Sequence, residues 1–461
     1  MRRRDFTRIG GLGALGFWLG VDPAEGAAHP LGLTGAPERR PSGRQPTLSP
    51  LQALEVDPGR LGRRMQTLAT FGANDQGGID RVAFSDANVE ALEWLEGLLH
   101  EAGFSVERDL VGNLVARKPG SASGLRPIVF GSHVDSVPGG GNFDGQVGVM
   151  ASVEVASVLA EADHTTRHPL EIVVFTNEEG GKTGSRALVG EVEPFELDIV
   201  TASGLTIGEG LEKLGGDPER LAEARRREGS MEAFLELHVE QGAILDQDDI
   251  DIGVVQGIVG IMRWTVIAEG VTNHAGTTPM DRRTDALVGA ARFIDAVHRT
   301  ALEMPGRQVA TVGIVEPEPG APNVIPGRVR MTLEIRDLSM EGIADVFDAI
   351  RGEATDIEGD TGVTFTFERF YTSRAAPTDP RLRDMIEAAA HELGLTSRRM
   401  PSGAGHDAQS MALIGPVGMI FVPSVAGVSH APDEHTELED IVNGANVLLR
   451  TVLTLDARSL G

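Results

Sequence analysis

Two stretches of this sequence place histidine and carboxylate side chains where an apolar segment ends. The run GSHVD holds His133 and Asp135 and leads into a glycine-rich turn that carries Asp144, while a second run carries Glu178 and Glu179. Because α/β sheets bind ligands at the carboxyl edge of their strands, we expect these groups to meet there. Neighbouring residues of an extended chain point to opposite sides, so one glutamate can bind a metal while the other faces a substrate.

Two further histidines stand beside acidic residues in similar settings. His238 lies in the run ELHVEQG and His430 in the run SHAPDE. A single histidine beside a carboxylate is commonly a structural hydrogen-bonding residue, but four such runs at strand ends or glycine turns favour a shared site. The chain has no cysteine, so a metal must be held by His, Asp and Glu. These residues suffice for two divalent ions, and nitrogen and oxygen ligands suit zinc or manganese.

The elements that must position these residues alternate between helices and short apolar strands. Amphipathic periodicity predicts a helix over 86–101, and an apolar run predicts a strand over 170–176. This alternation is typical of an α/β domain, here with a mixed central sheet flanked by helices. Between 255 and 366 the order becomes strand, helix, strand, strand, helix, strand, which predicts an inserted two-layer α+β domain. The larger domain is then expected over 49–254 and 367–461.

The first part of the chain has the composition of an export signal. Arg3 and Arg4 in the run RRDF match a twin-arginine pattern, and the apolar stretch after them is shorter than the ~20 residues of a membrane-spanning helix. We therefore expect residues 1–28 to direct export to the periplasm, with a basic disordered tail as the alternative. Residues 29–48 have linker composition. A GLGALG run at 11–16 matches a dinucleotide-binding pattern, but no strand precedes it.

Composition disfavours several partners and chemistries. The formal net charge of −27 would repel nucleic-acid phosphates and anionic membrane surfaces, so neither is an expected partner. Hydrophobic residues make up 41% of the chain, which is enough for an ordinary buried core. The sequence has no G-x-S-x-G run, which disfavours a serine hydrolase of the usual α/β kind.

Seven runs occur in a fixed order, namely GSHVDSVPGGGNFDG, TNEEGG, LHVEQG, NHAGTTPMDRRTDA, PNVIPG, SGAGHDA and SHAPDE. With these runs the chain resembles the M20-type metal-dependent hydrolases, the peptidase family that includes carboxypeptidases and aminoacylases, over about residues 50–461. It is most similar to the branch of N-carbamoyl-L-amino-acid hydrolase and allantoate amidohydrolase. The resemblance implies an enzyme that uses two divalent metal ions to hydrolyse a carbon–nitrogen bond of a small ureido acid.

The resemblance also implies roles for individual residues. Asp135 would hold a ligand imidazole in one tautomer, which suits the short spacing of the His-x-Asp pair. Glu178 would be the general base that takes a proton from water and delivers it to the leaving nitrogen. The metal ligands would be His133 and His238 for one ion, Glu179 and His430 for the other, and Asp144 as the bridge between them.

The insert is expected to act as a lid and as a dimerisation domain. By resemblance it would contribute His274 from the partner subunit of a homodimer, where the imidazole could stabilise the oxyanion of the tetrahedral intermediate. The alternative for His274 is a packed loop histidine. Arg336 and Asn323 would bind the α-carboxylate of the substrate, since a planar guanidinium can hold a carboxylate through two hydrogen bonds. Gln241 and His406 would lie near the ureido end.

Several alternatives stay open on the sequence alone. Arg336 could pair with Asp337 or Glu334 instead of a substrate. Glu334 departs from the pattern of this branch, which has Asp at that position. The extra methylene of Glu could shift Arg336. His238 favours ureido hydrolysis over peptidase or aminoacylase activity, since the resemblance implies a carboxylate at this place in peptidase relatives. A metal-bearing binding protein without catalysis is disfavoured by the presence of Glu178.

Overall fold

The computed structural model describes residues 53–460 of the chain. The export signal predicted over 1–28 and the linker predicted over 29–48 lie outside the described residues. By its contacts the chain divides into a unit over residues 1–47 and a second unit, Leu48–Gly461, which contains all the elements below. Among the described residues, no helix combines the length and the apolar content needed to cross a bilayer.

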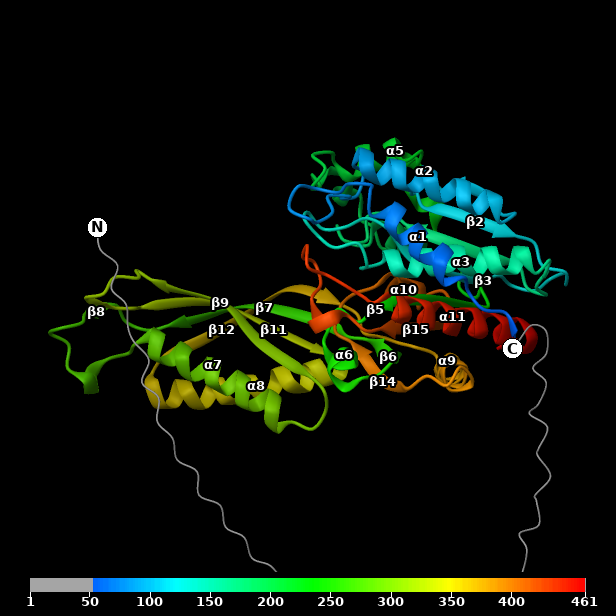
Figure 1. Ribbon diagram of the computed structural model, residues 1–461. Helices are drawn as coiled ribbons and strands as arrows, with labels where there is room; N and C mark the ends of the chain where they lie inside the picture. Colours follow the sequence, from blue (N-terminus) through cyan, green and yellow to red (C-terminus); the bar gives the residue numbers. More distant parts are fainter. Residues whose placement is uncertain (1–52, 461) are drawn as a thin grey trace, which may run out of the picture. The chain divides into compact units, whose positions relative to one another are not determined.

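The larger of the two main sheets has nine strands and is mixed. They are β1 (Ser105–Arg108), β2 (Leu114–Lys118), β3 (Ile128–His133), β4 (Leu170–Phe175), β5 (Ala233–Val239), β6 (Ile252–Ile258), β13 (Ala376–Pro377), β14 (Ser397–Ser402) and β15 (Val417–Val422). Their order is β1-β2-β4-β3-β5-β15-β6-β13, and β14 pairs with β6 beside this path. The four central strands β4, β3, β5 and β15 run parallel to one another, so their carboxyl ends share one edge (Figure 1).

Helices cover both faces of this sheet. Successive side chains of each strand point to opposite faces, and each face needs helices to bury its apolar side chains. They are α1 (Pro58–Leu68), α2 (Asp86–Glu101), α3 (Gln146–Glu161), α4 (Thr183–Val189), α5 (Ile207–Lys213), α6 (Ile244–Asp248), α9 (Pro380–Glu392), α10 (Asp407–Met411) and α11 (Leu438–Arg458). Ile128 and Phe130 point into the core shared with α1, α2, α3, α9 and α11, whereas Val129 points to the core with α4 and α10. The predicted α/β domain with a mixed sheet flanked by helices is confirmed.

A smaller domain is inserted between β6 and β13. It contains β7 (Gly260–Glu269), α7 (Ala286–Glu303), β9 (Val309–Glu318), β11 (Arg328–Asp337), α8 (Met340–Thr361) and β12 (Thr364–Ser373), with a short pair formed by β8 (Asn273–His274) and β10 (Val324–Ile325). Its antiparallel sheet has the order β12-β7-β11-β9, and α7 and α8 cover one face (Figure 1). Trp264 of β7 stacks on Phe347 of α8 with ring centroids 4.1 Å apart, which ties helix to sheet.

The observed limits of the insert differ from the predicted 255–366. Strand β6 pairs with β14 and β15 in the larger sheet, so the smaller domain starts at Gly260. At the other end β12 continues to Ser373, because its pairing with β7 resumes after a bulge and runs on to Ile261. Apolar periodicity could not mark either limit, since at each one a strand of one sheet leads almost directly into a strand of the other.

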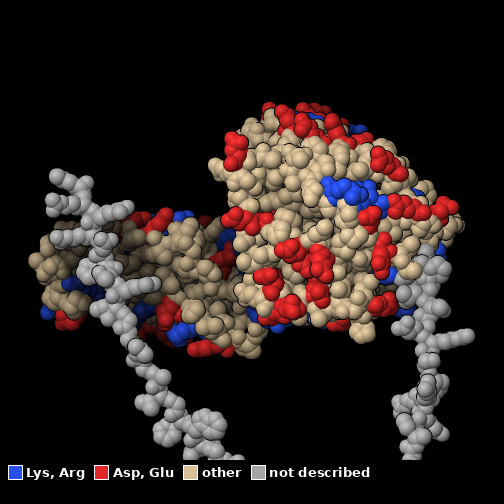
Figure 2. Space-filling model, in the orientation of Figure 1, with Lys and Arg blue, Asp and Glu red and all other residues tan. Residues whose placement is uncertain are grey.

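Acidic side chains are spread over the face of the molecule in Figure 2, and a small basic group lies over α1. Arg60 and Arg64 of α1 are both paired with the buried carboxylate of Glu154 in α3, at 2.7 Å each. These arginines therefore serve the packing of α1 against α3. Short 3₁₀ helices complete the described chain at η2 (Pro194–Asp198), η3 (Pro218–Ala224), η4 (Met280–Arg282) and η5 (Val425–Gly427).

Candidate metal centre and active site

Two buried imidazoles meet one oxygen of Asp144. Nε2 of His238 lies 3.2 Å from Oδ1 of Asp144, and Nε2 of His133 lies 3.7 Å from the same oxygen. His133 ends β3 and His238 stands one residue before the end of β5, so two adjacent parallel strands deliver both imidazoles to one edge. Together the three residues form a group that could hold a metal ion.

The second oxygen of Asp144 faces another group. Oδ2 lies 3.1 Å from Nε2 of His430, and this nitrogen lies 3.4 Å from Oε2 of Glu179. Glu179 follows β4, whereas His430 lies in the loop after β15 and has a half-exposed side chain. Asp144 therefore belongs to two groups that could each hold a metal ion, one formed with His133 and His238 and the other with Glu179 and His430. The structure brings together all five side chains that were predicted as ligands.

Main-chain carbonyls orient the two buried imidazoles. Nδ1 of His133 lies 3.1 Å from the carbonyl oxygen of Asp135, and Nδ1 of His238 lies 2.9 Å from that of Val239. A carbonyl oxygen only accepts, so each Nδ1 carries the donated proton and each Nε2 is directed toward Asp144. This is the orientation in which Nε2 can bind a metal.

Asp135 differs from its predicted role as the carboxylate that holds an imidazole. Its Oδ1 lies 3.7 Å from Nδ1 of His133, too far for a hydrogen bond, and the main-chain carbonyl of Asp135 accepts from the imidazole instead. The carboxylate accepts the backbone N–H groups of Glu178 and Glu179 at 3.3 and 3.1 Å. Asn177, just before them, has a left-handed φ of +54°, which turns the chain at the end of β4. Asp135 thus orients the two glutamates.

The charges of this site favour a bound cation. Burial and the negative charges of Asp144 and Glu178 raise the pKa of Glu179 to about 10. Burial also raises the pKa of Glu178. Burial alone would lower the pKa of His238, but its hydrogen bond to Asp144 prevails and raises the pKa to about 9. A divalent ion relieves such repulsion between buried carboxylates and replaces the proton on a ligand imidazole, so the donor set fits metal ions.

Glu434 is a residue of this centre that the sequence analysis did not assign. Its Oε1 accepts the backbone N–H groups of Phe143 and Asp144 at 2.9 Å each. Its Oε2 accepts from the N–H of His430 at 3.2 Å and lies 3.1 Å from the hydroxyl oxygen of Ser429. Glu434 therefore ties the glycine-rich turn to the loop after β15. Its place in the SHAPDE run was the available signal, but a loop carboxylate does not reveal which distant amides it binds.

Gln241 and His406, predicted near the ureido end, lie at this centre. Nε2 of Gln241 donates to Oδ2 of Asp144, and its Oε1 is buried without a hydrogen-bond partner. The His406 ring lies 4.4 Å from the His238 ring, and its Nε2 lies 2.8 Å from Oγ of Ser402. Burial and the charge of His238 lower the pKa of His406, so its imidazole stays neutral near pH 7. The buried Oε1 of Gln241 is an acceptor that a substrate N–H could satisfy.

The three residues of the insert that were predicted to act on the substrate, His274, Asn323 and Arg336, do not lie among the residues around Asp144. His274 and Asn323 lie beside each other at the β8–β10 end of the smaller domain, which Figure 1 shows away from β5 and β15. Arg336 lies where the two domains touch, because its Nη1 donates to the carbonyl oxygen of Gly403 at 2.6 Å. Its Nε donates to Glu334 at 2.7 Å, so the ion pair considered from the sequence is present.

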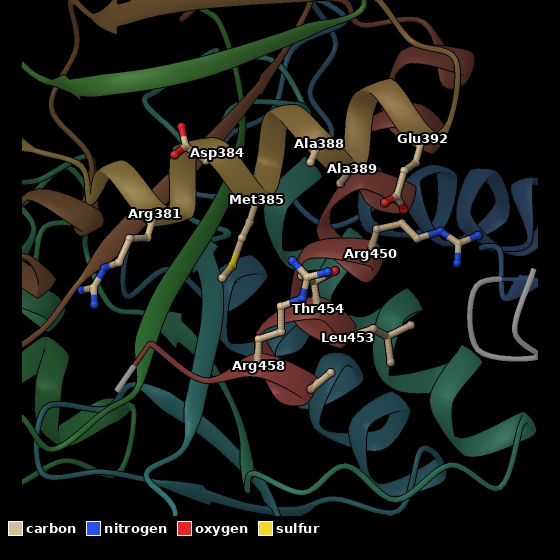
Figure 3. Close-up of a pocket in the computed structure, with 11 residues that line it drawn as sticks. Arg381, Asp384, Met385, Ala388, Ala389, Glu392, Arg450, Leu453, Thr454 and Arg458 are labelled. Carbon is tan, nitrogen blue, oxygen red and sulfur yellow. The ribbon is translucent and has the colours of Figure 1, made fainter.

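A surface hollow of about 520 Å³ lies between α9 and α11 (Figure 3). Arginines and acidic residues of the two helices line it, among them Arg381, Asp384, Glu392 and Arg458. Arg381 is paired with Asp379 at 2.7 Å. None of the described residues that line the hollow belongs to the ligand groups, so it does not compete with the centre around Asp144 as the site of catalysis.

Comparison with known proteins covers every residue of this centre. Residues 129–454 match the model of Peptidase family M20/M25/M40. The chain belongs to this family. The N-carbamoyl-L-amino acid amidohydrolase of Geobacillus stearothermophilus is 39% identical over 401 residues, which are 86% of this chain and 98% of that relative. The allantoate amidohydrolase of Escherichia coli is 32% identical over 387 residues, which are 83% of this chain and 94% of that relative.

Among solved structures, an amidase of the hydantoinase/carbamoylase family from Burkholderia multivorans matches this M20 chain with a TM-score of 0.81 and 35% identity. The match covers 88% of this chain and 100% of that structure. These findings confirm the predicted family and branch, and with them a hydrolase that acts on carbon–nitrogen bonds. The roles of individual residues stay predictions.

Proposed function

We propose that this M20 chain hydrolyses the ureido group of an N-carbamoyl-L-amino acid with two divalent ions, zinc or manganese. The observation that carries the proposal is the position of Asp144, whose two oxygens face two separate ligand groups. Glu178 stands beside the same centre, with Oε2 3.8 Å from Nε2 of His133. The names of the relatives support an amidohydrolase, and a shell of nitrogen and oxygen donors suits either ion.

The residues of this chain divide the work of such a hydrolysis. When bound, two divalent ions polarise a carbonyl and lower the pKa of a water molecule toward ~7. Glu178 takes a proton from the attacking water and returns it to the leaving nitrogen as the C–N bond breaks. Burial raises the pKa of Glu178, which brings the carboxylate closer to a pH at which it can both accept and donate. The products are an amino acid and carbamic acid, which decomposes to carbon dioxide and ammonia.

A hollow beside the centre supports the choice of ureido acid. It has a volume of about 260 Å³ and is bordered by Glu179 and Asp135. Its other lining residues are mostly apolar, and they include Val82, Ala83, Val137, Pro138, Ile199, Val200, Ala202 and Ile207. None of the described residues that line it is a cation, so it does not suit a carboxylate. The hollow suits the apolar side chain of an N-carbamoyl amino acid better than the polar second ureido group of allantoate.

The substrate carboxylate is assigned to Arg336 and Asn323, which are both carried by the smaller domain. The acidic chain would repel an anionic substrate, so a local cation is needed for its capture. Arg336 is already positioned at the domain junction by Glu334 and Gly403. Asn323 and His274 lie at the other end of the smaller domain, so their participation requires the partner subunit of a homodimer. We assign dimerisation to this domain.

We also propose that the protein is exported, directed by a signal in residues 1–28, which lie outside the described residues. Arg3 and Arg4, with the apolar stretch after them, support a twin-arginine signal and a periplasmic location. Fractionation of the native host tests this proposal. The wild-type protein should appear in the periplasm, and replacement of both arginines by lysine should leave it in the cytoplasm.

A substrate panel tests the proposed reaction. Purified protein loaded with zinc or manganese would be given N-carbamoyl-L-amino acids with apolar and polar side chains, allantoate, ureidoglycolate and dipeptides. We expect ammonia from the N-carbamoyl amino acids, fastest for those with apolar side chains. Release of free amino acids from dipeptides without ureido hydrolysis would favour the peptidase alternative. Faster turnover of allantoate would reject the assignment of the apolar hollow.

A further inference from the structure

Arg81 is a fully buried arginine whose hydrogen bonds all go to uncharged acceptors. It lies in the loop between α1 and α2 and has no exposed surface. Its Nε donates to the carbonyl oxygen of Val134 at 2.7 Å, and its Nη2 donates to Oδ1 of Asn142 at 3.0 Å. Removing a guanidinium from water is costly, so the bonds that it makes must compensate within the folded protein.

The acceptors of Arg81 belong to both chain segments that carry the first ligand group. Val134 follows His133 directly, and Asn142 stands two residues before Asp144. The third set of bonds goes to the end of α1, where Nη1 donates to the carbonyl oxygens of Leu68 and Phe71 at 2.8 and 2.9 Å. One rigid guanidinium therefore joins the end of β3, the glycine-rich turn and the last turn of α1.

The chemistry of the side chain explains why this position holds arginine. A guanidinium offers five donors in one plane with fixed angles, so the acceptors that it binds are also held at fixed positions. The carbonyl oxygen of Leu68, the last residue of α1, carries part of the negative charge of the helix terminus, which suits a cation. A lysine ammonium could reach one or two of these acceptors, but it could not span all three segments.

We propose that Arg81 is a positioning residue that sets the distance between His133 and Asp144 and thereby the affinity of the centre for metal. The inference rests on the proposed metal centre and adds a residue that touches neither the metal ligands nor a substrate. Partners that orient metal ligands from outside typically change metal affinity by about 10- to 100-fold when they are removed. Arg81 binds two segments that carry predicted ligands, the end of β3 and the glycine-rich turn.

The test compares the zinc affinity of the metal-free full chain with that of two variants, by competition with a chromophoric chelator. Arg81→Lys should weaken zinc binding by about 10- to 100-fold. Arg64→Lys is the matched control, because Arg64 is also largely buried but binds Glu154 and Ser157 instead of the ligand segments. The control should bind zinc as the wild type does.

Hydrogen exchange of the metal-free proteins gives a second readout, which a general loss of stability would not reproduce. Arg81→Lys should speed amide exchange over 133–145 more than over α3. If this variant does not fold, Asn142→Ala removes the Nη2 acceptor, together with the bond that Nδ2 of Asn142 donates to the carbonyl oxygen of Met65, and should give a smaller loss of the same kind. Wild-type affinity and exchange in the folded variant would overturn the role of Arg81 and leave the metal centre intact. A wild-type chain that binds no zinc would overturn both.

Discussion

Asp144 is held by the side chains of Gln241, Ser429 and Glu434. Its Oδ2 accepts from Gln241 and from the hydroxyl of Ser429, the latter at 2.9 Å, besides facing His430. Its backbone N–H is bound by Glu434. A carboxylate restrained in this way cannot rotate freely, so its two oxygens stay directed at the two ligand groups.

Glu178→Gln should separate metal binding from catalysis. The substitution keeps the shape of the side chain and all five ligands, but it removes the carboxylate that carries the proton. We expect kcat to fall by about 10²- to 10⁴-fold while the metal content is unchanged. Steady-state kinetics together with metal analysis of the same sample measure both quantities. A near-normal kcat would assign the proton transfer to another group.

Arg336→Lys should act on the binding of the substrate carboxylate. Lysine keeps the charge but loses the planar fork, and a hydrogen bond to a charged group contributes about 1.5–3 kcal/mol. We therefore expect KM for an N-carbamoyl amino acid to rise by about 10- to 100-fold. KM for the corresponding carboxyl amide should change little. An equal rise for both substrates would make the pairing of Arg336 with Glu334 purely structural.

Residue types and spacing indicated the four runs that carry histidines and carboxylates, and the resemblance to the M20-type hydrolases supplied the five ligand candidates within them. They could not show that Asp135 uses its carbonyl for His133 and its carboxylate for backbone amides, since both groups belong to one residue. They also missed Glu434 and Arg81. The groups through which these two act on the centre, such as the carbonyl of Val134 and the amides of Phe143 and Asp144, lie far away in the sequence, and backbone groups carry no signal of their own.

The start of α3 lies against both strands that carry the histidines predicted as ligands. This close approach depends on Gly148, where an added Cβ would lie 2.1 Å from the carbonyl oxygen of Leu237 and 2.9 Å from Cβ of Ser132. These two residues directly precede His238 and His133. The absence of a side chain at this position therefore lets the helix support both ligand strands.

Gly148→Ala should destabilise the fold and disturb the centre together. Forcing a methyl group into a filled space costs about 1–3 kcal/mol, and here the clash is with backbone. Urea unfolding measures the loss. Gly97→Ala is the control, because Gly97 is exposed in α2 and its Cβ would meet nothing within 4 Å. The control should gain about 0.5–1 kcal/mol from better helix propensity. Equal stability of Gly148→Ala and the wild type would reject this role of Gly148.

The elements themselves were largely predictable from the sequence. The helix predicted over 86–101 has the same limits as α2, because Ser85 caps it and apolar residues repeat on one face. The strand predicted over 170–176 matches β4 within one residue. The limits of the insert were missed, since pairing with β14, β15 and β7 decides them, and pairing partners are not written in local periodicity.

Among the described residues, few side-chain hydrogen bonds connect the smaller domain to the larger one. Arg336 donates to the carbonyl oxygen of Gly403, and Nε2 of Gln409 donates to Oγ of Ser373 at 3.2 Å. Lys182, near the centre, also donates to Gln409. The residues that bond across the junction, Gly403 and Gln409, flank His406 in the sequence. A change in the position of the smaller domain would therefore shift the segment that carries His406.

The proposed dimer should form through the open edge strand β9. This strand leaves Ile314 and Val315 with 44% and 41% of their surface exposed, and exposed apolar side chains on an unpaired sheet edge favour pairing with another chain. Ile314→Glu should convert a dimer to a monomer in light scattering and lower activity, because His274 of the partner is lost. Thr366→Glu on the opposite edge strand, β12, is the control. A wild-type monomer with full activity would contradict the dimer.

We propose that two divalent ions, held by the five residues around Asp144, are required for ureido hydrolysis. The most direct measurement titrates zinc or manganese into chelator-treated protein and follows metal content and ammonia release from an N-carbamoyl-L-amino acid in parallel. We expect no turnover without metal and full activity at about two ions per chain. Full turnover by protein that retains no metal, or saturation of binding without activity on any ureido acid, would contradict it.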